Sequence, residues 1–562
     1  FCLAGGLIVQ MAFLAFYGNP FEQLFLRTVS SLSGGFFEVG VTIQNVPDFL
    51  RAYPDLMPGW TAHPRAHPPG IVLLFRGSEA LFALMPRLSD WLAGIFRPWQ
   101  CHHRVLMALP DSAISAASLG MALPLIGALA VFPTYDLARR LYDRGTGLRA
   151  ALWLPLIPSF IMFTPQWNQS FILLTLLGLW LLHRGLAEVR PLYLGLTGML
   201  MSVATFLSFT NVNLIGMLGV YGLVYVGIVG RHIWPRSDWR RIITGSALFI
   251  VGLVSVWLIY YLISGVTIFE LLSIALTIHY ELHEPYLPWL FFFPVDLILF
   301  SGLVFSALAG VEIVRSAGRV IGNPREARPD AVLPLTLLIC VLGLDVSGLV
   351  RGEVARLLLW LMPLVVIVAA HAATTLADRY TDRGALDLAL AVQLVVMVGF
   401  LRVIGTELAP PPTPPFIAEP PATQFSAQAI FGEQQAELIG YDASLSATRD
   451  TLNLTLYWRS LERFDHSYFV SAILVGEDGQ PAGVNDWLPV EGGYPTSCWR
   501  PGEIVIDHTA IPLNAAPSPG NYWLSISLFD FETGERLPVA VPGQAPDTQV
   551  GLGPIPIPAA TP

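Results

Sequence analysis

Apolar runs long enough to cross a lipid bilayer follow one another along the first 404 residues. A helix rises 1.5 Å per residue, so about 20 apolar residues cross a hydrocarbon layer of about 30 Å. Only 13% of the chain is charged, about half the share of an ordinary soluble domain. We therefore predict a multi-pass α-helical membrane protein with about 11 transmembrane helices. The predicted spans cover 1–17, 113–135, 149–164, 170–183, 191–208, 213–230, 242–264, 289–314, 333–350, 356–376 and 387–404.

Arginine placement gives these spans a direction, because short cytoplasmic loops collect basic residues. All 31 basic residues of the chain are Arg. Sixteen of them lie in five alternate loops, at 136–149, 184–190, 231–241, 315–330 and 377–386. The short loops between hold only Arg351, with Arg356 at a helix start. The Arg-rich loops are therefore predicted to be cytoplasmic, and the first loop (18–112) and all residues after 404 to be exoplasmic.

The long first loop is expected to contain helices that lie in the membrane interface. Its stretch 70–96 is apolar, but Arg76, Glu79, Arg87 and Asp90 interrupt it. An alternative places two further spans, at 70–97 and 104–135, and keeps the same sidedness.

A proline-rich linker, 409–422, separates the helical region (1–408) from a C-terminal domain (423–562). Proline cannot continue a helix, so the linker is expected to be extended. Short alternating runs follow at 452–458, 468–475 and 522–529, with turn signals such as Pro519-Gly520. This pattern predicts an all-β sandwich. Its tryptophans, Trp458, Trp487, Trp499 and Trp523, form either a sugar-stacking platform or, as is commoner in small sandwiches, part of the core.

The cysteines and the charge balance give no support for several classes of site and partner. Cys2, Cys101, Cys340 and Cys498 are widely spaced and predict neither a disulfide framework nor a zinc-ligand set. The net charge is −10, and no basic tract indicates a nucleic-acid partner.

Three polar clusters lie on the predicted exoplasmic face, where polar groups beside a membrane are costly and often functional. In the first, prolines hold His63, Arg65 and His67, which suits a phosphate or a metal. The alternative is a proline-shaped turn between two interfacial helices.

In the second cluster, His279 and His283 share a helix face at i and i+4 and can share a metal with Glu284 as oxygen ligand. A polar interfacial turn is the alternative. In the third, Arg351 and Arg356 offer planar forks that suit phosphate oxygens. An internal pair with Glu353 that closes a helical hairpin is the alternative there.

Together these features resemble the GT-C superfamily of polyprenyl-phosphate-sugar glycosyltransferases, which includes protein O-mannosyltransferases (glycosyltransferase family 39) and aminoarabinose transferases. The compact motifs of this resemblance are His67-Pro68-Pro69-Gly70 and the stretch from Arg351 to Arg356. The C-terminal domain looks like a β-sandwich appended to such proteins in Chloroflexota-type bacteria, on Gly440-Tyr441, Tyr494-Pro495-Thr496-Ser497 and Pro501-Gly502-Glu503.

The resemblance implies a transferase of the bacterial plasma membrane whose C-terminal domain lies outside the cytoplasm. Family enzymes move a sugar, with inversion, from a polyprenyl-phosphate carrier to a glycan, lipid or protein acceptor, and a first-loop carboxylate is the base. A cation or Arg stabilises the departing phosphate. His63, Arg65, His67, Arg351 and Arg356 are then candidates for binding the donor phosphate, and a divalent metal ion is a candidate cofactor.

The acidic pair that the family usually has in the first loop is missing. In related members the pair stands four residues before an aromatic residue. When this aromatic is aligned with Phe36, Leu32 and Ser33 replace the pair and Glu38 matches a Glu two residues after the aromatic. We expect Glu38 or Asp48 to act as the base instead. The absent pair also supports an alternative, a non-catalytic envelope scaffold that binds a glycan or partner. A transporter is less favoured, because no internal repeat is visible.

Overall fold

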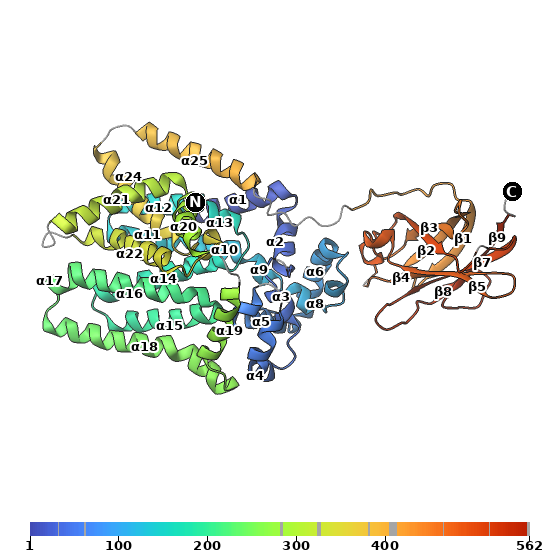
Figure 1. Cartoon of the computed structure of the whole chain (residues 1–562), viewed down its shortest axis with the longest axis horizontal. Helices are drawn as coiled ribbons and strands as arrows, with labels where there is room; N and C mark the ends of the chain where they lie inside the picture. Colours follow the sequence, from blue (N-terminus) through green and yellow to red (C-terminus); the bar gives the residue numbers. More distant parts are fainter. Residues whose placement is uncertain are drawn as a thin grey trace. The chain divides into compact units, whose positions relative to one another are not determined.

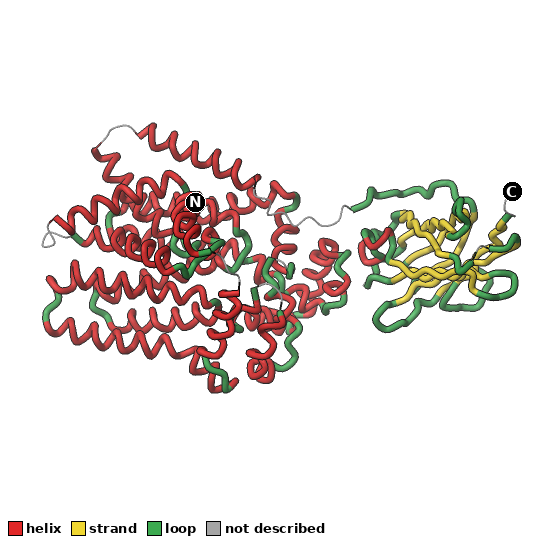
Figure 2. The backbone as a smooth tube through the Cα atoms, in the orientation of Figure 1, coloured by secondary structure: helices red, strands yellow, loops and turns green. Residues whose placement is uncertain are grey.

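The computed structural model describes residues 1–31, 33–60, 63–281, 285–322, 328–379, 383–403, 413–464, 466–515 and 517–558. The chain forms two compact units, a helical one (1–85 and 115–408) and a β-rich one (86–114 and 409–562). Figure 1 shows the helices and strands by position in the sequence, and Figure 2 shows that strands are confined to the C-terminal region. The predicted fold class, a helical membrane region followed by a β domain, is confirmed.

The helical unit contains a bundle of long apolar helices. Its elements are α1 (Cys2–Leu14), α10 (Leu123–Leu129), α11 (Val131–Leu141), α12 (Arg144–Trp153), α13 (Pro158–Met162), α14 (Asn168–Ala187), α15 (Pro191–Leu207), α16 (Val212–Tyr225), α18 (Arg236–Ser264), α19 (Ile268–Glu281), α20 (Tyr286–Ser301), α21 (Leu303–Gly322), α22 (Val332–Ser347), α23 (Val354–Leu357), α24 (Met362–Arg379) and α25 (Arg383–Val403). Large apolar side chains on α18, such as Ile250, Val254 and Leu258, are exposed. Such a face suits contact with lipid.

Among the described residues, five helical stretches are long and apolar enough to cross a membrane, and two sharply bent helix pairs raise this to as many as seven. Several of the remaining predicted spans coincide with shorter apolar helices, including Pro191–Leu207. The predicted spans at 170–183, 213–230, 242–264 and 333–350 all fall largely on long helices.

Two predicted spans are wrong as single helices. The stretch 149–164 is broken into α12, a 3-10 turn (Leu154–Leu156) and α13, because Pro155 and Pro158 lack the amide hydrogen that a helix interior needs. The stretch 289–314 bends by 113° between α20 and α21. Gly302 has φ 105 at this break, and the Gln393 side-chain oxygen accepts a 2.8 Å hydrogen bond from the freed amide of Val304.

The first loop consists of short helices, as expected. These are α2 (Pro20–Val29), α3 (Phe36–Val41), α4 (Val46–Leu56), α5 (Gly70–Ala83), α6 (Pro86–Phe96), α7 (Arg104–Met107) and α8 (Asp111–Ser115). The alternative span at 70–97 is not formed, because the chain breaks between α5 and α6 before Pro86. The alternative span at 104–135 overlaps a continuous helical stretch, Asp111–Leu141.

The C-terminal strands form two antiparallel sheets. They are β1 (Phe425–Phe431), β2 (Ala436–Leu445), β3 (Thr451–Ser460), β4 (Phe469–Val475), β5 (Pro481–Trp487), β6 (Ile504–Pro512), β7 (Gly520–Phe529), β8 (Val539–Ala540) and β9 (Val550–Ile557). The sheets have the orders β6-β3-β2-β1-β8 and β5-β4-β7-β9, and the inner side chains of both belong to one core. Trp458 and Trp499 are fully buried there, so the sugar-stacking platform is wrong for these two and the core alternative is confirmed.

The β-rich unit also contains the end of the first loop. A disulfide joins Cys101 to Cys498, 397 residues apart. Nearby, Arg104 forms a 3.2 Å ion pair with Glu532 and lies over the ring of Phe531. Our expectation that the cysteines form no pair is therefore wrong, because the pairing is set by the packing of distant segments.

Candidate functional site

The first polar cluster forms a 3-10 turn, Pro64–Ala66, in the helical unit. Two glycines hold the turn in place. Gly35 has φ 74 and packs against Pro64, a backbone conformation that other residues rarely adopt. Gly70 lies so close to the chain at Phe206 that a side chain there would clash with the Phe206 carbonyl oxygen. The turn between them brings His63 and His67 to one place.

A pocket of the helical unit, with a cavity volume of about 50 Å³, is lined by residues that are far apart in the sequence. Its lining includes Arg27, His63, His67, Asn168 and Arg356. Aromatic side chains, among them Phe36, Phe75 and Trp167, line it as well. The pocket therefore offers two guanidinium groups and two imidazoles beside flat apolar surfaces.

Arg356 and His63 are in direct contact, although they are 293 residues apart in the sequence. Nη1 of Arg356 donates a 2.6 Å hydrogen bond to Nε2 of His63. Since a guanidinium can only donate, this imidazole must accept and is neutral. Burial and the nearby positive charge of Arg356 lower the pKa of His63 to about 3. Asn168 donates a 3.3 Å bond to the Arg356 carbonyl oxygen and so anchors this segment.

His67 is held by its backbone neighbours. Its Nδ1 lies 2.7 Å from the His63 carbonyl oxygen, which can only accept, so Nδ1 carries the proton. The hydroxyl of buried Tyr53 donates a 2.9 Å bond to the His67 carbonyl oxygen. Burial lowers the pKa of His67 to about 4. At neutral pH the ring is uncharged, and Nε2 has an available lone pair.

Arg27 is a residue of the pocket that the sequence analysis missed. It is only 7% exposed, and Nη1 donates a 3.0 Å bond to the Thr164 carbonyl oxygen. The Thr164 hydroxyl bonds to Gln10, which also accepts a 2.7 Å bond from Gln169. A buried polar network thus fixes the backbone that holds Arg27. The signal available in the sequence was an Arg at the end of the apolar run Leu24-Phe25-Leu26.

Two other predicted phosphate residues lie outside the pocket lining. Arg65 points to Glu281, with 3.5 Å between Nη2 and Oε2. Arg351 donates a 2.9 Å bond to the Gly348 carbonyl oxygen and lies over the ring of Tyr286. Of the five predicted phosphate residues, the structure brings His63, His67 and Arg356 together.

The two predicted bases also lie away from the pocket lining. Glu38 is exposed on α3. Asp48 is at the start of α4, where its side chain is 64% exposed and pairs with Arg51 at 2.5 Å. Leu32, one of the two positions of the missing acidic pair, is outside the described residues. Among the described lining residues of the pocket, no side chain is a carboxylate.

The predicted metal cluster is only partly described. His279 lies near the end of α19, whereas His283 and Glu284 are outside the described residues. Within the part of the chain that is described, no group of three or more His, Cys, Asp or Glu side chains could hold a metal ion. The metal site stays a prediction.

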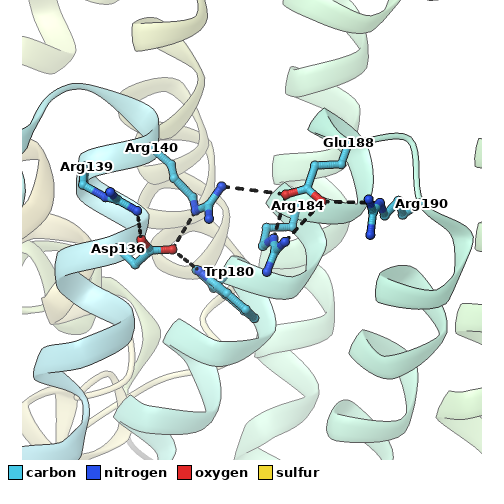
Figure 3. Close-up of polar contacts among 7 residues, drawn as sticks. All are labelled: Asp136, Arg139, Arg140, Trp180, Arg184, Glu188 and Arg190. Atoms are coloured by element: carbon cyan, nitrogen blue, oxygen red, sulfur yellow. Dashed lines mark hydrogen bonds and ion pairs between the residues drawn. The ribbon is translucent and has the colours of Figure 1, made fainter.

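A network of charged residues lies at the C-terminal end of α14, where Glu188 follows the helix. Figure 3 shows the contacts among these residues. Asp136 accepts hydrogen bonds from Arg139, from Arg140 at 2.6 Å and from Trp180 at 2.7 Å. Glu188 accepts two bonds from Arg184, at 2.8 and 3.2 Å, and lies 3.6 Å from Arg190. These bonds from Arg184 lower the pKa of Glu188. The network joins two of the loops predicted to be cytoplasmic.

The pocket and this arginine network lie at opposite ends of one helix. Asn168 begins α14 and lines the pocket, and Arg184 lies 16 residues later. At 1.5 Å per residue, this separation is about 24 Å, close to the thickness of a hydrocarbon layer. If the network is cytoplasmic, as Arg placement predicts, the pocket opens at the exoplasmic end.

Comparisons with known proteins find remote structural neighbours. No protein-family model matches the chain, and no curated protein matches it. Among solved structures, ArnT from Cupriavidus metallidurans is similar with 15% identity over 66% of this chain and 63% of that chain, at a TM-score of 0.39. The archaeal oligosaccharyltransferase AglB from Archaeoglobus fulgidus is similar with 11% identity over 70% of this chain and 55% of that chain, at a TM-score of 0.36. Each match thus spans less than two thirds of the solved chain.

Proposed function

We propose that this protein is a membrane glycosyltransferase that takes a sugar from a polyprenyl-phosphate carrier and passes it, with inversion, to a glycan, lipid or protein acceptor on the exoplasmic face. The observation that carries the proposal is the pocket where Arg27 and Arg356 meet His63 and His67. The sequence resemblance to GT-C transferases, on His67 to Gly70 and Arg351 to Arg356, supports it.

The pocket suits a sugar phosphate on chemical grounds. Guanidinium groups bind phosphate oxygens through paired N–H donors, and Arg27 and Arg356 both line the pocket. As the bond to the anomeric carbon breaks, negative charge grows on the leaving phosphate, and fixed cations in a partly buried site stabilise it. The rings of Phe36 and Trp167 in the lining offer apolar faces for the sugar or the first prenyl unit.

The reaction also needs a proton acceptor. The acceptor oxygen attacks the anomeric carbon, its proton passes to a base, and the phosphate leaves with the electron pair. Glu38 and Asp48 remain predictions for this role. The described pocket lining itself offers Nε2 of His67, whose lowered pKa of about 4 is similar to that of a carboxylate. We include His67 in the proposal as the base.

The disulfide supports the exoplasmic location of the pocket. Disulfides persist in oxidising compartments outside the cytoplasm, and Cys101 is paired with Cys498. His63 and Cys101 both belong to the first loop, 18–112, which is predicted to be exoplasmic.

The test is transfer from radiolabelled polyprenyl-phosphate-linked hexose and pentose donors by the full-length protein in lipid nanodiscs. We expect the Arg356→Gln variant to lose turnover and the Arg184→Gln variant, changed at the other end of α14, to keep it. Equal turnover of the two variants would contradict the proposed site. A His67→Gln variant that still binds donor but does not transfer sugar would support the assigned base.

A second function has one observation in its favour. Because the described pocket lining contains no carboxylate, a non-catalytic protein that binds lipid-linked glycan is the alternative. Tight donor binding without turnover in the wild-type protein would favour it.

A further inference from the structure

Arg356 has one N–H group that none of the described residues satisfies. Nη1 donates to His63 at 2.6 Å, and Nη2 donates to the carboxylate of Glu353. Nε is buried and makes no hydrogen bond within the described parts of the chain. A buried unpaired donor on a charged group is costly. The edge formed by Nε and Nη2 is therefore only half occupied.

Glu353 is a weak occupant of that edge. Its side chain is 60% exposed, whereas that of Arg356 is 14% exposed. It lies outside the pocket lining and contacts Arg356 from three residues earlier in the chain. Its backbone is left-handed, with φ 49 and ψ 28, a conformation that is unfavourable for any residue that has a Cβ atom. An ion pair so exposed to water contributes little free energy.

A phosphate fits the same edge better than Glu353 does. The two parallel donors of a guanidinium edge match two oxygens of a phosphate, and such a ligand would satisfy Nε as well as Nη2. We propose that Glu353 is a displaceable counter-ion, which pairs with Arg356 while the pocket is empty and gives up Nη2 when the phosphate of the lipid carrier binds. This inference rests on the proposed function, because it takes that phosphate as the ligand.

Competition between Glu353 and the phosphate predicts whether a mutation of Glu353 strengthens or weakens phosphate binding. If Glu353 merely positions Arg356, its removal weakens phosphate binding. If Glu353 competes with the phosphate, its removal strengthens binding. We expect Glu353→Gln to bind undecaprenyl phosphate about two- to fivefold more tightly than wild type, the range for an exposed ion pair.

The experiment measures undecaprenyl phosphate binding to the full-length protein in nanodiscs, for wild type, E353Q, R356Q and the double variant. The effect of E353Q should vanish in the R356Q background, because the two residues act through one contact. The matched control is Glu270→Gln, which removes another exposed carboxylate, at the start of α19 and outside the pocket lining, and should leave affinity unchanged. A gain in E270Q equal to that in E353Q would indicate a general charge effect and overturn the inference.

Failure of the inference and failure of the proposed function are distinguishable. If R356Q loses binding while E353Q binds as wild type or more weakly, the displaceable counter-ion is wrong and the lipid-phosphate site stands. If wild type binds no better than R356Q, the proposed function fails and the inference with it. Inorganic phosphate that competes as tightly as the lipid would show that the site takes the free anion, and would overturn the lipid assignment.

Discussion

The two ends of α14 both hold arginines, but in different environments. At the Arg184 end, four arginines surround Asp136 and Glu188, and both carboxylates accept several hydrogen bonds (Figure 3). At the Asn168 end, Arg27 and Arg356 line a pocket without a carboxylate among its described lining residues. The arginines at the Arg184 end meet carboxylates within their network, whereas Arg27 and Arg356 line a cavity and Arg356 pairs with a carboxylate, Glu353, from outside the lining.

This difference separates a structural role from a binding role. Arginines whose donors already meet carboxylates fix helix ends to one another and attract anions weakly. An arginine that faces a cavity with a buried unpaired donor, as Arg356 does within the described chain, gains most when an anion enters. The contrast predicts that mutations at the two ends affect different measurements.

The largest expected effect concerns which side of the membrane each end faces. In intact cells, Cys101 and Cys498 should resist a membrane-impermeant maleimide and become fully labelled after a membrane-impermeant reductant. This follows because the disulfide is predicted to be exoplasmic. A cysteine introduced at Arg190, which is 66% exposed in the network, should remain unlabelled until the membrane is opened. Labelling of the introduced cysteine in intact cells would show that the orientation is opposite to the predicted one.

The next largest effect separates the two ends by lipid binding. We expect Arg356→Gln to weaken undecaprenyl phosphate binding about tenfold to a hundredfold, since a hydrogen bond to a charged group contributes about 1.5 to 3 kcal/mol. Arg184→Gln should change affinity less than about twofold, because its partner is Glu188. Titration in nanodiscs measures both variants, and a greater loss in Arg184→Gln would break the comparison.

A smaller effect is expected on stability at the network end. Asp136→Asn removes the charge that accepts from Arg139, Arg140 and Trp180. Partly exposed ion pairs contribute about 0.2 to 1 kcal/mol each, so the midpoint of thermal unfolding should fall by a few degrees while lipid affinity stays unchanged. Reduced affinity with unchanged thermal stability would contradict the structural role.

The smallest effect is expected on the pH dependence of donor affinity, which should be nearly flat. His63 and His67 have pKa values lowered to about 3 and about 4, so neither gains a proton between pH 5.5 and 8. Affinity for a sugar phosphodiester donor should therefore vary less than about twofold in that range. A tenfold change would need a difference of about 1.4 kcal/mol in binding free energy. An inflection near pH 6.5 that disappears in His67→Gln would show that His67 has an ordinary pKa.

The lowered pKa values of His63 and His67 also predict how the free energy of unfolding changes with pH. The unfolded chain takes up protons at these two histidines below about pH 6.5, whereas the folded chain does so only near pH 4 and below. The stability contributed by the neutral rings is therefore complete above pH 6.5 and declines as the pH falls toward 4. A double variant, His63→Asn with His67→Gln, should lose less stability than wild type between pH 7 and pH 5.

The sequence predicts the parts of this molecule that depend on local pattern. Alternation and turn residues predict β3, β4 and β7 to within a few residues, and hydropathy predicts the helical region. Polar residues that survive beside apolar spans identify His63, His67 and Arg356, which the fold then brings to one pocket. Each of these signals lies within a short stretch of chain.

The missed features depend on packing between distant segments or on one backbone angle. Cys101 and Cys498 are 397 residues apart, and their spacing carries no information about pairing. Hydropathy does not detect the positive φ of Gly302, so a helix bent there was expected to be straight. Arg27 belongs to the pocket only because α2 turns by 85° after the first helix.

The most direct test of the account is a cryo-EM structure of the full-length protein in nanodiscs with undecaprenyl phosphate. We expect phosphate density at the Asn168 end of α14, within hydrogen-bond distance of Nε and Nη2 of Arg356, and Glu353 turned away from that edge. Phosphate density among the arginines at the Arg184 end, with Glu353 still paired to Arg356, would contradict it.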